Sequence, residues 1–267
     1  MERRRVSPFA RRTHGDEGAG VDDFLTHVEA AGLTDVGRRR SLNEDCWRME
    51  PELGLFLVAD GLGGHQAGEV ASRLALETIV DALRRRDLDD LLGGDDGGRS
   101  EAVKAAVAEA NGRIRHENDR LGHGEDSMGT TVVGLLLETP EQAVVFHVGD
   151  SRIYRLRDGR LEQMTRDHSL HQQWLDGGGG GAEPKKNVIL RALGPFPEAE
   201  AEVAAVPTRP GDVWLLCSDG LTGMVEDDEI AKIIATHPNL ETACQALIEA
   251  ANDAGGKDNI TAVLVRR

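Results

Sequence analysis

Apolar residues follow two different periods along this chain, and the two periods predict strands in some segments and helices in others. Short apolar runs at 27–37, 46–51 and 53–60 are typical of strands, and the third, LGLFLVAD, is typical of a fully buried strand. The segment 68–86 instead repeats its apolar residues at helical spacing and ends in arginines. A second helix is expected over 100–121, where a serine provides a favourable N-cap and a glycine follows the last turn.

The second half of the chain continues this mixture of short strands and helices. Strands are expected at 129–138 and 142–150, and alternating runs on either side of Asp158-Gly159 predict a β-hairpin with a tight turn. The remaining predicted elements are a strand, a pair of helices and a last strand, at 212–220, 226–254 and 259–267. Because strands come in hairpin-like groups and helices in pairs, we expect antiparallel sheets with helices laid on the outside.

The N-terminal segment and one glycine run depart from these patterns. Residues 1–26 include five arginines within the first twelve positions and lack the apolar core of a secretory signal. We expect this segment to be disordered, with a docking arm for an acidic partner as the alternative. One folded domain would then cover 27–267, since single domains can reach this size. The unbroken glycine run at 177–181 is expected to be mobile.

The overall charge and the cysteines limit the classes of partner and compartment. Forty-seven acidic side chains against thirty-one basic ones give a net charge of −16, which would repel nucleic acid and anionic membranes. No apolar run approaches the roughly 18 residues that a membrane span requires. The three cysteines share no metal-binding spacing and leave one unpaired in any disulfide scheme, which favours a reduced, cytoplasmic setting.

Four carboxylates occupy similar positions at the edges of apolar strands. Asp60, Asp150 and Asp219 each end a predicted strand beside glycine or serine, and Asp258 comes just before the last strand. Side chains at strand ends are held by the sheet and can converge, and magnesium or manganese ions prefer oxygen ligands. An isolated aspartate beside a glycine is more often part of a turn than a ligand, so spacing alone leaves both interpretations open.

Eight short motifs stand in order along the chain, and together they carry a family resemblance. They are RSLNED at 40–45, VADGLGGH at 58–65, MGTT at 128–131, VGDSRIY at 148–154, RDHSL at 166–170, NVILRALG at 187–194, CSDGL at 217–221 and KDNIT at 257–261. In this order they resemble the bacterial branch of the metal-dependent protein phosphatases, the type-2C class. The resemblance extends over 27–265 and therefore covers nearly everything except the N-terminal segment.

The resemblance implies a fold and a metal centre. The implied fold is α+β, with a central antiparallel β-sandwich flanked by pairs of α-helices in four layers, αββα. The implied centre holds two manganese or magnesium ions and hydrolyses phosphoserine and phosphothreonine in proteins through a metal-activated water. By matching motif positions, Asp60 would bridge the two metals and the Gly61 carbonyl would bind one of them. Asp219 and Asp258 would complete the ligands, and Asp150, with Asp219, matches a third, weaker site.

Other matched positions are implied to act on the substrate or on water. Arg40 would hold the phosphate, which suits a bidentate guanidinium, and Glu44 and Asp45 would order water on the metals. His65 is the candidate general acid for the leaving serine or threonine oxygen, with a histidine that only orders local water as the alternative. We expect structural roles for four further residues, Thr130, Thr131, His147 and Asn259.

One segment departs from the family pattern. Bacterial members usually carry a helical flap beside the active site, and the corresponding segment near 170–187 is short and interrupted by five glycines. Each glycine disfavours a helix by roughly 1 kcal/mol relative to alanine. We therefore expect a truncated, mobile flap, with substrate selection that depends less on a rigid lid.

These observations predict a protein serine/threonine phosphatase that acts on phosphorylated proteins and opposes a bacterial serine/threonine kinase. The alternative is a non-catalytic regulatory or binding module with the same fold. The intact metal-ligand positions oppose that alternative, since a module that no longer catalyses would be expected to lose at least one of them. We expect a monomer without a nucleic-acid partner. The sequence does not distinguish manganese from magnesium, because both take the same oxygen ligands.

Overall fold

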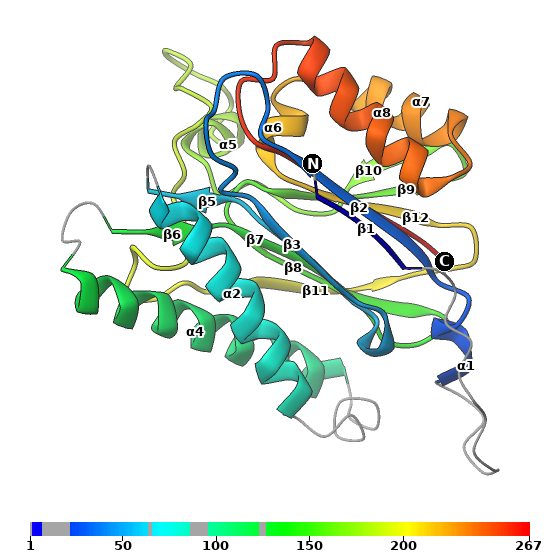
Figure 1. The fold of residues 1–267 in the computed structure, drawn as a ribbon, viewed down its shortest axis with the longest axis horizontal. Coiled ribbons are helices and arrows are strands. Elements are labelled where there is room, and N and C mark those ends of the chain that lie inside the picture. Colours follow the sequence, from blue (N-terminus) through cyan, green and yellow to red (C-terminus); the bar gives the residue numbers. More distant parts are fainter. Residues whose placement is uncertain (1, 7–21, 64–65, 86–95, 123–126) are drawn as a thin grey trace.

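Two antiparallel β-sheets stacked face to face form the centre of the structure (Figure 1). The computed structural model describes residues 2–6, 22–63, 66–85, 96–122 and 127–267. The strands of the larger sheet are, in spatial order, β1 (Glu2–Val6), β2 (Glu29–Asp35), β13 (Ile260–Arg266), β12 (Val213–Cys217), β9 (Arg152–Arg157) and β10 (Arg160–Gln163). Those of the second sheet are β11 (Glu202–Pro207), β8 (Gln142–Val148), β7 (Val132–Leu137), β4 (Leu55–Ala59) and β3 (Cys46–Glu50). A short ribbon pairs β5 (Gly61–Leu62) with β6 (Gly129–Thr130).

Strand β4 shows how the sequence builds the stacked layers. Every residue of the strand is buried, and successive side chains belong to different cores. Leu55 and Leu57 pack with the helices outside the sheet, whereas Phe56 and Val58 pack between the two sheets, where Trp214 of β12 also lies. Because both faces of β4 are covered, its sequence is an unbroken apolar run and does not alternate with polar residues.

Two pairs of helices cover the outer faces of the sandwich (Figure 1). Helices α2 (Gln66–Arg85) and α4 (Asp96–Leu121) share one apolar core with the five-stranded sheet. Helices α7 (Asp227–Thr236) and α8 (Leu240–Asp253) share another with the six-stranded sheet. The predicted α+β sandwich with four layers is confirmed. The shorter helical segments are α1 (Asp22–Leu25), η1 (Pro51–Leu53), α5 (Leu170–Asp176) and α6 (Asp219–Thr222).

Among the helices that the structure describes, none is both long enough and apolar enough to cross a bilayer.

The N-terminal segment differs in part from the disorder expected for 1–26. Residues 2–6 form β1, which pairs antiparallel with β2 and becomes the edge of the six-stranded sheet. Strand addition of this kind uses the backbone N–H and C=O groups of an open edge and does not need an apolar sequence, which explains why periodicity does not reveal it. Residues 22–25 form α1, and residues 7–21 lie outside the described part of the chain.

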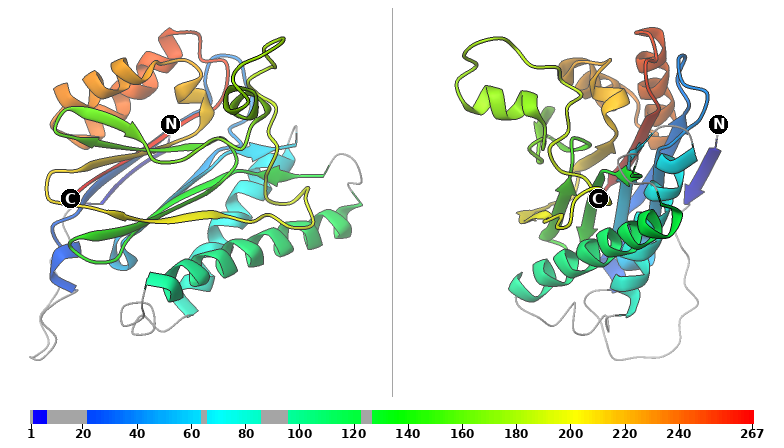
Figure 2. Two further views of the ribbon diagram at one scale, coloured as in Figure 1. Left: turned by 180° about the vertical axis from the view of Figure 1, so that it is seen from behind. Right: turned by 90° about the vertical axis from the view of Figure 1, so that its left-hand side faces the viewer.

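The predicted hairpin and the predicted break in the flap both correspond to observed features. Asp158 and Gly159 have φ angles of 52° and 78°, the two positive values that this tight turn requires. In the flap, α5 starts after Ser169, whose side chain accepts a hydrogen bond from Gln172 N. It ends at Asp176, directly before the glycine run. Helix α5 and the loop after it project away from both sheets (Figure 2).

Candidate metal centre

The four strand-end aspartates converge at one end of the sandwich. Asp60 and Asp150 follow β4 and β8 of one sheet, whereas Asp219 follows β12 of the other and Asp258 comes just before β13. Burial raises the pKa of Asp60 well above its usual value, and four neighbouring carboxylates raise it further: Asp45, Asp219, Asp150 and Asp258. Burial also raises the pKa of Asp219, as does the nearby Asp258. Carboxylates that affect one another in this way are close together in a poorly solvated site.

Two of these side chains, Asp60 and Asp219, influence each other directly. Asp60 and Asp219 each appear among the groups that shift the pKa of the other, and two buried carboxylates this close repel each other when both are ionised. A divalent cation stabilises such a group of buried acids, because its positive charge offsets the repulsion between the carboxylates.

Two buried carboxylate oxygens support the same interpretation. Asp45 Oδ1 and Asp150 Oδ1 are buried and have no hydrogen-bond partner among the described residues. Burial is the main cause that raises the pKa of each side chain to about 7. Buried oxygens without donors are costly, and oxygen atoms are the ligands that magnesium and manganese prefer. The donor set therefore fits hard divalent cations.

Asp45 is held in place by two hydroxyl groups from the opposite sheet. Ser218 Oγ donates to Asp45 Oδ2 at 2.7 Å, and Thr261 Oγ1 donates to the same oxygen at 2.6 Å. Ser218 directly precedes Asp219 in the chain. The two hydrogen bonds thus join the loop between β2 and β3 to the ends of β12 and β13, and they leave Asp45 Oδ1 directed elsewhere.

The backbone at Asp60 is fixed by two consecutive threonines. Thr131 Oγ1 accepts a hydrogen bond from Asp60 N at 3.0 Å, while Thr130 Oγ1 and Thr131 N donate to Asp60 O at 2.8 and 2.9 Å. Thr131 Oγ1 also lies 2.7 Å from the hydroxyl of Ser151, the residue after Asp150. These hydrogen bonds tie two of the converging strand ends together, so both threonines have structural contacts of the kind expected for them.

Arg40 places a positive charge at the edge of the aspartate group. Its Nη2 donates to Asp258 Oδ2 at 2.7 Å, and its side chain is 47% exposed. The hydrogen bond to Asp258 raises the pKa of the guanidinium. Glu44 and Asp45, from the same loop, are buried. A half-exposed arginine beside buried carboxylates can reach a phosphate that approaches from solvent.

The structure therefore brings together nearly all the residues that the sequence analysis singled out. Arg40, Glu44, Asp45, Asp60, Asp150, Asp219 and Asp258 lie in or beside one group of loops and strand ends. Gly61 follows Asp60 directly. His65, the candidate general acid, lies outside the described residues. Sequence reasoning did not identify Ser218 or Ser151, although each is next to one of the aspartates in the motifs CSDGL and VGDSRIY.

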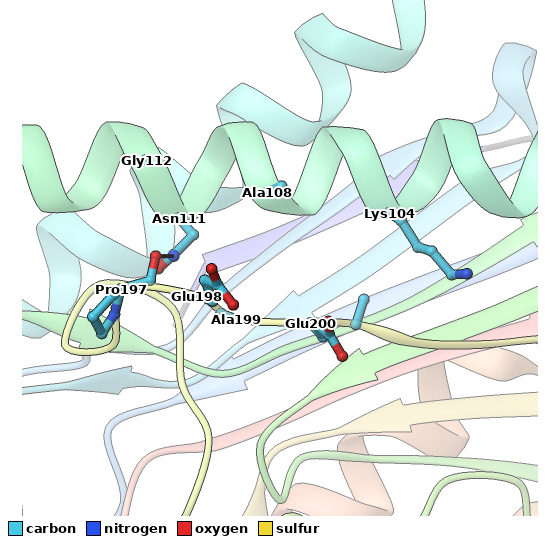
Figure 3. Close-up of a pocket in the computed structure, with 9 residues that line it drawn as sticks. Lys104, Ala108, Asn111, Gly112, Pro197, Glu198, Ala199 and Glu200 are labelled. Atoms are coloured by element: carbon cyan, nitrogen blue, oxygen red, sulfur yellow. Dashed lines mark hydrogen bonds between the residues drawn. The ribbon is translucent and has the colours of Figure 1, made fainter.

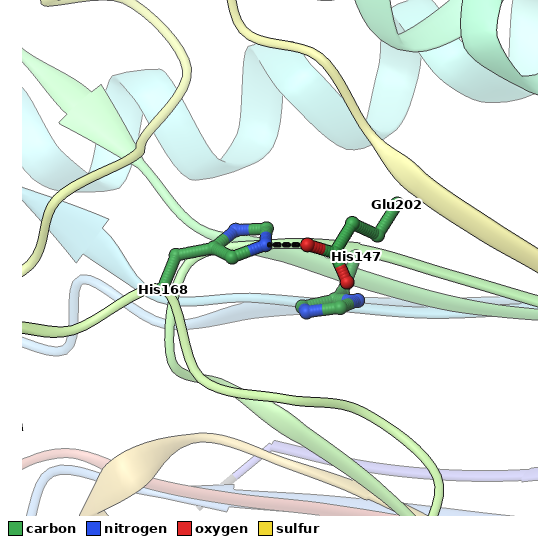
Figure 4. Close-up of side chains that lie close together, drawn as sticks. All are labelled: His147, His168 and Glu202. Carbon is green, nitrogen blue, oxygen red and sulfur yellow. Dashed lines mark hydrogen bonds and ion pairs between the residues drawn. The ribbon is translucent and has the colours of Figure 1, made fainter. Parts of the chain in front are cut away.

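A second group of ligand-type atoms lies in a cluster of His147, His168 and Glu202 (Figure 4), whose ligand atoms are within 4.8 Å of one another. Burial lowers the pKa of both histidines, so we treat them as neutral. His168 Nδ1 accepts a hydrogen bond from Gly149 N at 3.1 Å, so its proton is on Nε2, which donates to Glu202 Oε1 at 3.0 Å. A metal on Nε2 would require an imidazole without protons. The cluster is therefore a hydrogen-bonded anchor and not a cation site.

A cavity of about 650 Å³ lies between α4 and the segment 197–201 (Figure 3). Asn111 spans one side of it and donates to Phe196 O and Pro197 O at 3.2 and 3.3 Å. The residues that line the cavity include neither Arg40 nor any of the strand-end aspartates. We therefore do not place the reaction there.

Comparison with known proteins agrees with the interpretation of the aspartate group as a metal site. Residues 37–264 match the family model for protein phosphatase 2C. The chain is 37% identical over 252 residues to the serine/threonine phosphatase Stp of Listeria monocytogenes, a match that covers 90% of this chain and 96% of that protein. Among solved structures, it resembles PppA of Pseudomonas aeruginosa, described as a key regulatory component of T6SS, with a TM-score of 0.78 and 38% identity over 90% of this chain and 97% of that one.

A further solved structure contains metal. It is the catalytic domain of the serine/threonine protein phosphatase PstP in complex with two manganese ions, with a TM-score of 0.75 and 35% identity over 90% of this chain and 97% of that one. The family match, the relatives and the aspartate group all indicate the same class of protein. The chain belongs to the protein phosphatase 2C family.

Proposed function

We propose that this protein hydrolyses phosphoserine and phosphothreonine in other proteins, at a centre of two divalent cations held by its strand-end aspartates. The observation that carries the proposal is the convergence of Asp60, Asp150, Asp219 and Asp258 from two different sheets into one group of buried acids. Membership of the protein phosphatase 2C family and the manganese-containing relative support a phosphatase that depends on divalent metal.

In this proposal Asp60, the Gly61 carbonyl, Asp219 and Asp258 would hold the two cations. Asp150, together with Asp219, would hold a third and weaker ion. When bound, the cations lower the pKa of water and neutralise charge on the phosphoryl oxygens. Manganese is the ion we propose first, because a relative was solved with it, while oxygen ligands accept magnesium equally well.

The remaining assigned residues bind the substrate and control water. Arg40 would leave its ion pair with Asp258 to bind two phosphate oxygens, which its fork of donors fits well. Glu44 and Asp45 accept hydrogen bonds from water and so orient it. His65 would donate a proton to the serine or threonine oxygen as that oxygen leaves. No covalent nucleophile is needed in this scheme, and burial raises the pKa of the Cys217 thiol to about 12, which makes it a poor one.

We further propose a cytoplasmic setting and a cognate serine/threonine kinase whose products are the substrates. The three cysteines, Cys46, Cys217 and Cys244, are free thiols, in keeping with a reducing compartment. The chemistry itself requires a kinase as the source of phosphoserine and phosphothreonine. A role as a binding module without catalysis would need the aspartate group to be retained for another purpose, and no contact described above favours that.

The test is hydrolysis of p-nitrophenyl phosphate and of a phosphothreonine peptide, with added manganese or with excess EDTA. We expect turnover of both substrates with manganese and none with EDTA. Asp219→Ala should lower kcat/KM at least about a hundredfold, because it removes a preorganised charge at the reacting phosphate. Asp253→Ala, at the exposed end of α8, is the matched control and should leave turnover unchanged. A folded wild-type protein without turnover in any divalent metal would refute the proposal.

A further inference from the structure

The loop between β2 and β3, residues 36–45, carries the phosphate-binding candidate Arg40 on a long and half-exposed side chain. Two hydrogen bonds from backbone N–H groups hold the start of the loop: Gly37 N donates to the side-chain oxygen Asp35 Oδ1 at 2.9 Å, and Arg38 N donates to Gly256 O at 2.7 Å. These contacts do not determine how far the middle of the loop, with Arg40, extends toward the strand-end aspartates. That depends on how its two ends are joined.

One buried side chain joins the two ends of this loop. Asn259 Nδ2 donates to Val36 O at 3.0 Å and to Leu42 O at 2.8 Å. Its Oδ1 accepts from Glu44 N at 2.8 Å. Asn259 is only 4% exposed, so these three hydrogen bonds are shielded from water. The amide of Asn259 thus closes the neck of the loop whose middle carries Arg40, beside a second hydrogen bond in which Asn43 Nδ2 donates to Thr34 Oγ1 at 2.9 Å.

The same residue is attached to the metal centre. Asn259 N donates to Asp258 Oδ1 at 2.9 Å, and its carbonyl is so closely packed that a Cβ on Gly220 would lie 1.9 Å from it. Asn259 is therefore held by the segment that contains a proposed metal ligand, while its side chain holds the loop of Arg40. Any change in its side chain alters the position of the loop relative to the aspartates.

The chemistry of these contacts requires an asparagine. The two N–H groups on Asn259 Nδ2 donate to the carbonyls of Val36 and Leu42, and the amide oxygen accepts a hydrogen bond from the N–H of Glu44. An aspartate of the same shape would keep the acceptor for Glu44 but direct a carboxylate oxygen at two carbonyl oxygens. Buried acceptors without a donor cost free energy, and opening of the loop would relieve this cost.

We propose that Asn259 is a positioning residue that sets the distance between Arg40 and the metal ligands, and so determines how well the enzyme binds the substrate phosphate. This inference rests on the proposed function, since it needs a phosphate to be held between Arg40 and the aspartates. Asn259 itself touches neither the phosphate nor a metal in this scheme. It acts by keeping the neck of the loop closed.

The test is a double-mutant cycle between Asn259→Asp and Arg40→Ala, with the metal-loaded enzyme and a phosphothreonine peptide. In the wild-type background, Asn259→Asp should raise KM for the peptide about tenfold, the size expected when buried hydrogen bonds lose a partner. Its manganese affinity, measured by calorimetry, should change less than about twofold, because the metal ligands themselves are unaltered. In the Arg40→Ala background the same substitution should raise KM little further.

Asn118→Asp is the matched control for the loss of a buried amide. Asn118 Nδ2 donates to Met128 O at 2.9 Å and its Oδ1 accepts from Met128 N at 2.8 Å, so its amide holds the backbone at Met128. This variant should lower the melting temperature without changing KM. If Asn259→Asp does not fold, Asn259→Ser, which keeps one donor and one acceptor, replaces it in the cycle and should raise KM by a smaller factor.

The outcomes separate the two proposals. An equal effect of Asn259→Asp with and without Arg40, or an unchanged KM, would overturn the positioning role while leaving the phosphatase function intact. Absence of manganese-dependent turnover in the wild-type protein would instead remove the proposed function itself. A fall in kcat with no change in KM would show that Asn259 acts through Glu44 and not through Arg40, and would also overturn the inference.

Discussion

At Gly61 the backbone passes so close to two other segments that a side chain would collide with them. A Cβ at this position would lie 2.3 Å from Gly68 O and 2.6 Å from Glu44 O. Both contacts are to backbone, which cannot move aside as a flexible side chain can. Gly61 is thus required by the close approach of three segments at the metal centre, and its φ angle, which is not positive, plays no part.

Replacing Gly61 by alanine should therefore damage both folding and catalysis. We expect Gly61→Ala to lower the free energy of unfolding by about 1–3 kcal/mol, the usual cost of overpacking, and to abolish most manganese-dependent turnover. Gly112→Ala is the control, because nothing lies within 4 Å of a Cβ there and the residue is on an exposed face of α4. It should raise stability by about 0.5–1 kcal/mol. Urea unfolding measures both, and similar effects at the two positions would contradict the packing argument.

At the scale of elements, the glycine run in the flap ends helix α5, yet the run remains hydrogen-bonded to that helix. Helix α5 ends at Asp176, and Gly178, Gly179 and Gly181 then take positive φ angles of 89°, 67° and 82°. Trp174 Nε1 donates to Gly180 O at 2.8 Å, which folds the run back onto the helix. The glycines of this run form a turn that most other residues would not adopt.

Alanine at the three positive-φ positions should change the flap more than alanine at its other two glycines. Each such alanine costs roughly 1–2 kcal/mol in the left-handed region, so the loop should take another conformation. We expect kcat/KM on a phosphoprotein to fall about five- to tenfold, with little change on p-nitrophenyl phosphate, which is too small to contact the flap. The control is the double substitution Gly177→Ala with Gly180→Ala, where φ is not positive.

An equal loss of kcat/KM on the phosphoprotein and on p-nitrophenyl phosphate would contradict a contribution of this flap to substrate selection. Equal losses in the control double substitution would show that the glycines act through mobility and not through their backbone angles.

For the whole molecule, the buried aspartates between the two sheets make the free energy of unfolding depend on pH and on bound metal. Burial and neighbouring carboxylates raise the pKa of Asp150 to about 7 from an ordinary value of 3.8. Between these values the folded protein holds a proton that the unfolded chain has lost, so stability without metal falls as the pH rises through this interval. A bound cation reverses the penalty and binds the deprotonated acids best.

Manganese should therefore stabilise the protein more at pH 8 than at pH 5. Manganese at a concentration 100 times its Kd should add about 2.7 kcal/mol to the free energy of unfolding. At pH 5 the protonated aspartates bind manganese poorly, so most of this gain should be lost. Melting temperatures with manganese and with EDTA at both values measure it. Asp150→Asn should reduce the pH dependence of the metal-free protein by the contribution of one group, whereas Asp253→Ala should not change it. A manganese-induced shift of the same size at both pH values would contradict the linkage.

Several elements could not be predicted from local sequence. Strand β11 has a mixed sequence, EVAAVP, with exposed and half-buried residues, and it forms because β8 offers it an open edge. Helix α5 is only seven residues long, too short to be stable alone, and depends on the bridge between Ser169 and Ile189 at its base. Both owe their existence to partners distant in the sequence, which periodicity does not report.

The sequence by itself determined the position of most strands and helices, the tight turn at Asp158-Gly159 and the placement of aspartates at strand ends. It could do so because burial repeats over neighbouring residues and is therefore visible as local periodicity. Motif order also indicated the family. Only the tertiary structure decided that Asp60 and Asp219 come close enough to shift each other's pKa, and that Asn259 closes the loop of Arg40. Such distances depend on how two separately formed sheets stack, and no run of adjacent residues encodes that arrangement.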